Sequence, residues 1–288
     1  KKKKSRKIII HSSASINSAC AMLACVKLGV FFSVIFDDLP KSAIEKRLKI
    51  FSPDLILTNS KVNFLNYKKK VLLFKDIFNL KKNFKTKSKI LNSKNNFFCL
   101  FTSGTTGQPK GIIHSYGGYS VYCKYSCSKK FGMNNNSLVL TASDAAWING
   151  HTYSLFGPLL FGGTTILLER PQILLNYQIL KKILGLGVTI LYLPVTLIRL
   201  MKSIYPQKKL RLKNLKTIGS MGEPLAPDVG FWYEKYFLNK GKSIINTYFQ
   251  TETGGIIGSP NYKESNKHSP HGSVGKIITK HIVTNSLN

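Results

Sequence analysis

Residues 97–111 read Phe-Phe-Cys-Leu-Phe-Thr-Ser-Gly-Thr-Thr-Gly-Gln-Pro-Lys-Gly, and this stretch governs how the rest of the chain is interpreted. The apolar run Phe97–Phe101 predicts a buried strand. The run Thr102–Gly111 that follows is rich in glycine and hydroxyl residues. Glycines let the backbone turn sharply and approach a ligand closely, and the free N–H groups of such a turn form a nest for anions.

Lys110 adds a point positive charge to this turn, as a phosphate site needs. The spacing does not match a Walker A loop, which has four residues between its first glycine and a Gly-Lys-Ser/Thr ending. A flexible hairpin is the structural alternative, but a strand followed by ten suitable residues favours a phosphate-binding loop. The candidate phosphate ligands are Thr102, Ser103, Gly104, Thr105, Thr106, Gly107 and Lys110.

Short apolar runs alternate with amphipathic runs on both sides of this loop. Strands are predicted at 8–10, 31–35, 55–58, 97–101, 138–140, 164–168, 189–193 and 215–218. Helices are predicted at 15–28, 41–49, 115–131, 177–184, 194–204 and 227–238, with Gly29 ending the first. This alternation predicts an α/β fold in which helices flank mostly parallel sheets.

A stretch rich in lysine and asparagine, 79–96, is interpreted as a solvated connector. It divides the chain into an incomplete first α/β subdomain with its connector, 1–96, and a nucleotide- and acid-binding α/β subdomain, 97–288.

The composition is strongly basic, with 43 Lys and Arg against 12 Asp and Glu and a net charge of +31. The basic residues are spread over the whole chain, so we interpret them as compositional bias and expect no specific nucleic-acid partner. The five cysteines show no zinc spacing, and their odd number without a secretory segment predicts a reducing, cytoplasmic setting. No apolar run is long enough to span a bilayer, so no membrane insertion is expected.

Three further motifs lie after predicted strands. They are Gly219–Leu225 (Gly-Ser-Met-Gly-Glu-Pro-Leu), Asn246–Gly255 (Asn-Thr-Tyr-Phe-Gln-Thr-Glu-Thr-Gly-Gly) and Ala142–Tyr153 (Ala-Ser-Asp-Ala-Ala-Trp-Ile-Asn-Gly-His-Thr-Tyr). Each also has a purely structural interpretation when taken alone. The first suits a turn before a helix that begins at Pro227, the second a polar surface turn, and the third a core segment.

Taken together and in this order, the four motifs resemble those of the adenylate-forming superfamily, and within it the short-chain acyl-CoA synthetases of the acetyl-CoA synthetase type. The resemblance also covers Ala19–Gly29 and Ser33–Phe36, and it extends to about Gly275. It implies that the first loop holds the β- and γ-phosphates of ATP. It also implies that the nucleotide is lined by Gly222, Glu223, Pro224, Asn246, Thr247, Tyr248, Phe249, Gln250 and Thr251.

The resemblance assigns Thr251 to the α-phosphate and Glu252 to Mg²⁺, and with Lys110 these are the expected catalytic residues. One carboxylate together with nucleotide phosphates is a usual arrangement for Mg²⁺. The implied reaction has two steps. A carboxylate attacks the α-phosphorus of ATP and releases pyrophosphate, and the thiol of coenzyme A then attacks the acyl-adenylate and releases AMP. The expected ligands are therefore ATP, Mg²⁺, a small carboxylate and coenzyme A as co-substrate.

The acid pocket implied by the resemblance consists of Trp147, Ile148, Asn149, Met221 and Phe249. Acetate-specific relatives usually carry Val, Thr, Val and Trp at the last four positions. Phenylalanine in place of tryptophan enlarges the pocket, whereas isoleucine and methionine in place of valine reduce it. Because one methylene changes discrimination by only about 1–3 kcal/mol, acetate and propionate both remain open.

Members of this family continue with an aspartate segment, a hinge and a small C-terminal domain that carries a lysine needed for adenylation. No such motif follows Gly275, so the chain is expected to be an incomplete form that binds ATP weakly without completing the reaction. Its oligomeric state stays open.

Two alternatives remain. One is another adenylate-forming ligase, such as a medium-chain acyl-CoA synthetase or an amino-acid adenylation domain. The other is a non-catalytic basic binding protein that retains the fold and uses its charge on nucleic acid.

Overall fold

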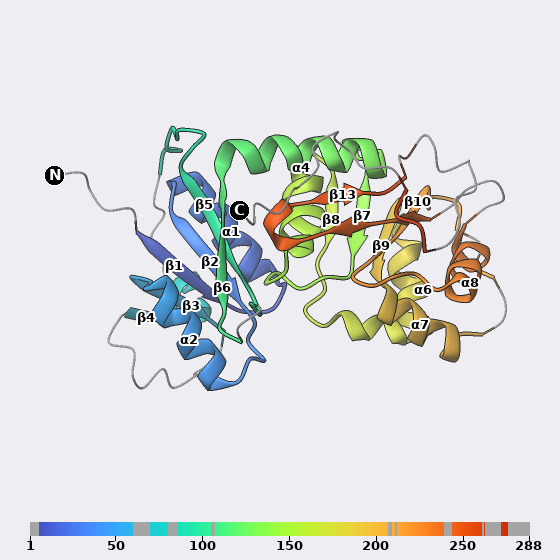
Figure 1. The fold of residues 1–288 in the computed structure, drawn as a ribbon, viewed down its shortest axis with the longest axis horizontal. Helices are drawn as coiled ribbons and strands as arrows, with labels where there is room; N and C mark the ends of the chain where they lie inside the picture. The colour runs from blue at the N-terminus through green and yellow to red at the C-terminus, as the bar shows by residue number, and fades with distance from the viewer. Residues whose placement is uncertain are drawn as a thin grey trace, which may run out of the picture.

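The computed structural model describes residues 6–59, 70–79, 86–104, 107–206, 209–210, 212–238, 244–260, 262 and 272–275. These residues form two main sheets with helices packed around them (Figure 1). The predicted α/β class with mostly parallel sheets is confirmed.

The first sheet has six strands in the order β4-β3-β1-β2-β5-β6, and every neighbouring pair is parallel except β5 and β6. Its strands are β1 (Lys7–His11), β2 (Phe31–Ile35), β3 (Leu55–Thr58), β4 (Lys70–Leu73), β5 (Asn96–Thr102) and β6 (Lys110–Ser115). Its helices are α1 (Ile16–Leu28), α2 (Lys41–Phe51) and α3 (Phe74–Phe78).

Local signals fix the ends of α1. The hydroxyl of Ser15 accepts a hydrogen bond from the Ser18 N–H at 3.2 Å, and the Ser18 hydroxyl accepts one from the Ser15 N–H at 2.8 Å. This reciprocal capping box satisfies two N–H groups that the helix itself leaves without partners. Gly29 ends the helix in the left-handed region, at φ 63°, as the sequence predicted.

The second sheet has five parallel strands in the order β11-β10-β9-β7-β8. They are β7 (Leu138–Thr141), β8 (Thr164–Ile166), β9 (Ile190–Pro194), β10 (Thr217–Met221) and β11 (Ile245–Asn246). The accompanying helices are a π-helix η1 (Gly150–Phe156), α5 (Gly157–Leu160), a 3-10 helix η2 (Pro171–Leu175), α6 (Tyr177–Gly185), α7 (Val195–Ile204) and α8 (Pro227–Phe237).

A short antiparallel ribbon follows the second sheet. It consists of β12 (Tyr248–Phe249) and β13 (Ile256–Gly258), with the 3-10 turn η3 (Thr251–Thr253) between them.

Helix α4 (Tyr116–Phe131) joins the two sheets. It follows β6 directly and extends along the top of Figure 1 from the first sheet toward the second. A single core cluster contains Phe32 and Phe98 of the first sheet, Tyr192 and Met221 of the second, and Phe131 of α4. The two sheets therefore share this cluster, and each sheet also has an apolar cluster of its own.

The structure differs from the predicted division of the chain. The sequence assigned the strand at 97–101 to the second subdomain, but β5 pairs with β2 in the first sheet, and β6 then pairs with β5. The chain therefore passes to the second sheet only after Ser115. The prediction differed because an apolar run indicates a strand but not the strand with which it pairs. Within the predicted connector, residues 86–95 are exposed or half-buried, and 80–85 lie outside the described residues.

None of the described helices has the length and apolar character needed to cross a membrane.

Candidate functional site

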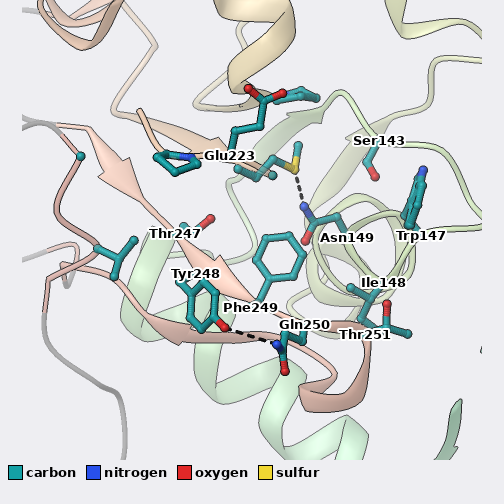
Figure 2. Close-up of a pocket in the computed structure, with 16 residues that line it drawn as sticks. Ser143, Trp147, Ile148, Asn149, Glu223, Thr247, Tyr248, Phe249, Gln250 and Thr251 are labelled. Carbon is teal, nitrogen blue, oxygen red and sulfur yellow. Dashed lines mark hydrogen bonds between the residues drawn. The ribbon is translucent and has the colours of Figure 1, made fainter. Parts of the chain in front are cut away.

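A cavity of about 610 Å³ opens at the carboxyl ends of the strands of the second sheet (Figure 2). Pro194 and Met221 are the last residues of β9 and β10, and Thr247 follows β11. The carboxyl ends of parallel strands are where open α/β sheets usually bind ligands. The wall consists of Ser143, Trp147, Ile148, Asn149, Pro194, Met221, Gly222, Glu223, Pro224, Thr247, Tyr248, Phe249, Gln250, Thr251, Gly272 and Val274.

The turn after β10 forms one side of this cavity. Gly222 has φ 90°, a backbone conformation that residues with a side chain rarely adopt, and a Cβ added there would meet no atom within 4 Å. The backbone is therefore open to close approach by a ligand. The Glu223 carboxylate is 3.1 Å from the Arg199 guanidinium on α7, so its charge is compensated.

The strand end at Thr247 is held by a directed chain of hydrogen bonds. The Thr247 hydroxyl donates to the Ser220 carbonyl at 2.8 Å, and the Tyr192 and Thr247 hydroxyl oxygens are 2.6 Å apart. Because Thr247 uses its proton on Ser220, Tyr192 is the donor in the second bond. Asn246 is buried behind the wall, where its amide donates to the Ser273 carbonyl at 3.0 Å.

The segment from Tyr248 to Gly254 is supported from both sheets. The carbonyl of Thr251 can only accept, so the Nε2 atom of His114 on β6 donates to it at 2.8 Å. The Thr152 hydroxyl of η1 donates to the Gly254 carbonyl at 2.8 Å. These bonds fix the turn that presents Thr251 to the cavity.

All five predicted acid-pocket residues lie in the cavity wall. Figure 2 shows the Asn149 side chain directed into the cavity, where its amide nitrogen donates to the sulfur of Met221. Trp147 is 53% exposed, and its ring makes an edge contact with Phe36, with ring centres 5.5 Å apart.

The phosphate loop is not part of this wall. It joins β5 to β6 as a hairpin in which Thr102 pairs with Lys110. Gly104 has φ 61°, and a Cβ there would lie 2.2 Å from the Gln108 carbonyl oxygen, so the turn requires glycine. Ser103, Gly107 and Lys110 are exposed, and Thr105 and Thr106 lie outside the described residues.

The loop and the Glu252 turn contact the same strand at different points. Lys110 begins β6, whereas the turn that carries Glu252 contacts His114 near its end. Four residues of strand separate the two contacts by about 13 Å. The structure therefore gathers the other three motifs at one cavity, while Lys110 and the exposed Glu252 lie outside its wall.

Burial governs the ionisation of several side chains around the cavity. It lowers the pKa of His114 below its usual range, although the hydrogen bond to Thr251 and the charge of Glu252 act the other way. Burial lowers the pKa of His151 to about 3 and raises the pKa of Asp144 to about 6. Both histidines are therefore neutral at pH 7, and Asp144 titrates close to neutrality.

No group of three or more His, Cys, Asp or Glu side chains converges within the described ranges. A protein-only metal cage is thus absent from that part of the chain. One carboxylate could serve only a cation that takes its other ligands from a bound molecule or from water. Glu252 suits this role, since it is exposed beside Thr251 and forms no ion pair with another described residue.

Sequence reasoning missed His114 and three wall residues, Pro194, Gly272 and Val274, and it included Ser143 only as part of the motif Ala142–Tyr153. Ser143 and Pro194 follow or end parallel strands, and that rule alone could have found them. The side chain of His114 stands on a strand that the sequence did not predict.

Comparison with known proteins places this chain in a family. A profile described as AMP-binding enzyme matches residues 2–284. The acetyl-coenzyme A synthetases of Xylella fastidiosa and Helicobacter pylori are 28% and 29% identical to this chain, over 89% and 90% of its length and 46% and 45% of theirs. Acetyl-coenzyme A synthetase 2 of Candida albicans is 38% identical over 59% of this chain and 26% of its own. The chain spans about half the length of the first two of these relatives.

A solved structure of the anthranilate CoA ligase AuaEII in complex with anthranoyl-AMP shares the fold. Its TM-score is 0.83 at 18% identity, over 95% of this chain and 54% of that one. Because the AMP-binding profile matches nearly the whole sequence, the chain belongs to the family of AMP-binding enzymes.

Proposed function

We propose that this chain carries the nucleotide and acid site of an AMP-forming acid–thiol ligase. Such an enzyme activates acetate or propionate with ATP and transfers the acyl group to coenzyme A. The observation that carries the proposal is the cavity. Three motifs from distant parts of the sequence line a single space of about 610 Å³, which is within the usual range for small-molecule sites. The sequence relatives named above support the choice of acid.

The proposal divides the cavity into two regions. The adenine and ribose lie along Gly222–Pro224 and Thr247–Gln250, and the acid lies among Ile148, Met221 and Phe249. Thr251 lies on the α-phosphate side, so the reacting carboxylate and phosphorus meet between the two regions. The β- and γ-phosphates then project beyond the wall toward the loop that carries Ser103 and Lys110.

The proposed chemistry joins two anions. A carboxylate oxygen forms a bond to the α-phosphorus while the bond to the bridging oxygen breaks, and the electron pair leaves with pyrophosphate. Lys110 and the amides of the loop stabilise the charge on that leaving group, and Thr251 positions the phosphorus. A Mg²⁺ held by Glu252 and the phosphates would add further positive charge beside the reacting groups.

The proposed setting is cytoplasmic. Cys25, Cys99, Cys123 and Cys127 are buried free thiols, as suits a reducing compartment. The proposed partners are small molecules, with no specific nucleic-acid partner.

Ligand-induced stabilisation tests the proposal without requiring turnover. Propyl-AMP, a stable ester that resembles propionyl-AMP, should raise the melting temperature, and the rise should increase with the ratio of its concentration to its dissociation constant. Trp147→Ala should weaken binding about tenfold, as loss of a large aromatic contact does. Phe231→Ala is the matched control, because Phe231 on α8 is 55% exposed, much like Trp147, but does not line the cavity.

Each alternative has its own outcome in this assay. Tighter binding of AMP esters of longer acids or of amino acids would favour another adenylate-forming ligase. No response to AMP or propyl-AMP, together with duplex DNA binding that falls steeply with salt, would favour a basic binding protein.

A further inference from the structure

The turn η3 carries two residues of the proposed reaction, and side chains from elsewhere in the fold hold both of its ends. The Thr251 carbonyl accepts from Nε2 of His114, and the Gly254 carbonyl accepts from the Thr152 hydroxyl, each at 2.8 Å. Neither His114 nor Thr152 lines the cavity. The first donor lies on β6 and the second on η1, so the two supports come from opposite sides of the site.

The hydrogen bonds of Thr152 have a defined direction. Because the Gly254 carbonyl can only accept, Thr152 uses its one proton there and accepts from the Tyr119 hydroxyl, 2.9 Å away. Thr152 is fully buried and Tyr119 is 5% exposed, so water does not compete for these bonds. Burial also raises the pKa of Tyr119 well above its usual range, so the phenol keeps the proton that it donates.

The end of the turn has little room to shift. Gly254 has φ 71°, and a Cβ added there would lie 3.2 Å from the His114 ring and 3.3 Å from the Tyr119 ring. The Gly254 N–H also donates to the Thr251 carbonyl at 3.3 Å. The two ends of the turn are thus joined, and a displacement of one end moves the other.

The helix that supplies Thr152 begins directly after the proposed acid wall. Residues Trp147–Asn149 line the cavity, and η1 starts at the next residue. The His151 N–H donates to the Trp147 carbonyl at 3.2 Å, so the backbone of the wall is tied to that of the helix. Thr152 therefore connects the wall proposed for the acid with the turn proposed for the α-phosphate.

We propose that Thr152 and His114 are positioning residues that set the place of the Thr251 hydroxyl against the α-phosphate without touching a ligand. The inference rests on the proposed function and adds two residues to it. Groups that are to react must be held within about 0.5 Å of the productive geometry, and side chains behind the contact supply that precision. Loss of either support should therefore weaken the hold on the phosphate and spare the hold on adenosine.

The affinities of AMP and adenosine test the inference, measured by calorimetry on the whole chain at one salt concentration. The two ligands differ only in the phosphate, so the ratio of their affinities isolates the contribution of that group. Thr152→Val keeps the shape of threonine and removes the hydroxyl. It should reduce the ratio about tenfold, as loss of a hydrogen bond to a charged group does, and leave adenosine affinity unchanged.

Further variants separate positioning from a general loss of stability. Thr152→Ser keeps the hydroxyl and should restore the ratio. Thr141→Val is the matched control, because it removes another buried hydroxyl, which donates to the Tyr153 carbonyl at 3.0 Å and not to the turn. It should lower stability and leave the ratio unchanged. His114→Phe keeps a ring without the donor, so it should also reduce the ratio, and it replaces Thr152→Val if that variant does not fold.

The outcomes distinguish this inference from the proposed function. If Thr152→Val and His114→Phe keep the wild-type ratio, or if Thr152→Ser loses as much as Thr152→Val, the inference is wrong while the nucleotide site stands. A reduced ratio in Thr141→Val would also overturn it, because the effect would then follow stability. If the wild type binds neither AMP nor adenosine, the proposed function is wrong as well.

Discussion

Ionisable side chains that are removed from water make the stability of the fold depend on pH. His151 stacks on Phe32 with ring centres 6.0 Å apart and is fully buried, and Asp144 is half-buried shortly before η1. Burial disfavours the charged form of both, so it lowers the pKa of the histidine and raises that of the aspartate. A rise in pH therefore increases the stability of the fold through His151 and decreases it through Asp144.

His151 should make the protein lose stability in acid. Its pKa in the folded state is about 3, whereas in the unfolded chain the imidazole takes up a proton near its ordinary pKa of 6.5. Stability is thus fully present above that value and declines as the pH falls toward 3, by up to about 1.4 kcal/mol per pH unit. In urea unfolding, His151→Leu should show a shallower decline than the wild type between roughly pH 6 and 4. Parallel curves would contradict this.

Asp144 should reduce stability at neutral pH. Its pKa in the folded state is about 6, above the ordinary value of 3.8, so stability falls as the pH rises between these values. Asp144→Asn removes the charge and keeps an oxygen for the Ala146 N–H, which now donates to the carboxylate at 2.8 Å. The variant should gain roughly 1–3 kcal/mol at pH 7 and lose this advantage below about pH 4. A less stable variant at pH 7 would show that the carboxylate is favourable as a charge.

Among the elements, the π-helix η1 shows where sequence reasoning stops. Apolar runs such as Phe31–Ile35 predicted strands well, because buried parallel strands are continuously apolar. The residue types of Gly150–Phe156 do not distinguish a π-helix from an α-helix. Strand β6 was not predicted because it has only two consecutive apolar residues, Ile112 and Ile113. The candidate site was predictable where a motif follows a strand. Gly272 and Val274 reach the wall only through the fold and carry no such signal.

Gly150, the first residue of η1, should not tolerate replacement by a residue with a side chain. A Cβ there would lie 2.0 Å from the carbonyl oxygen of Asp144, and backbone cannot move aside as a side-chain end can. Gly150→Ala should therefore lose about 3 kcal/mol or more in chemical unfolding.

Gly185→Ala is the control for this substitution, since a Cβ at the end of α6 meets no atom within 4 Å. It should be neutral or more stable by up to about 1 kcal/mol. Equal effects of the two substitutions would contradict the crowding at Gly150.

At the scale of the whole molecule, the net charge of +31 surrounds a site proposed for an anion. Such a field raises the local concentration of anionic ligands, and salt weakens it because the screening length shortens. ATP affinity should therefore fall at least about threefold between roughly 50 and 500 mM salt, whereas adenosine affinity should hardly change. Calorimetry with both ligands measures the difference. Identical salt dependence would show that the charge does not act on the site.

The apolar interior common to both sheets has a consequence for anyone who divides this polypeptide. Phe98 and Tyr192 belong to one cluster, and α4 contributes Phe131 to it. If the chain is divided after Ser115, each half exposes an apolar surface that only the other half covers. Separate halves should precipitate, co-expressed halves should reassemble, and calorimetric heating of the intact polypeptide should give a single peak.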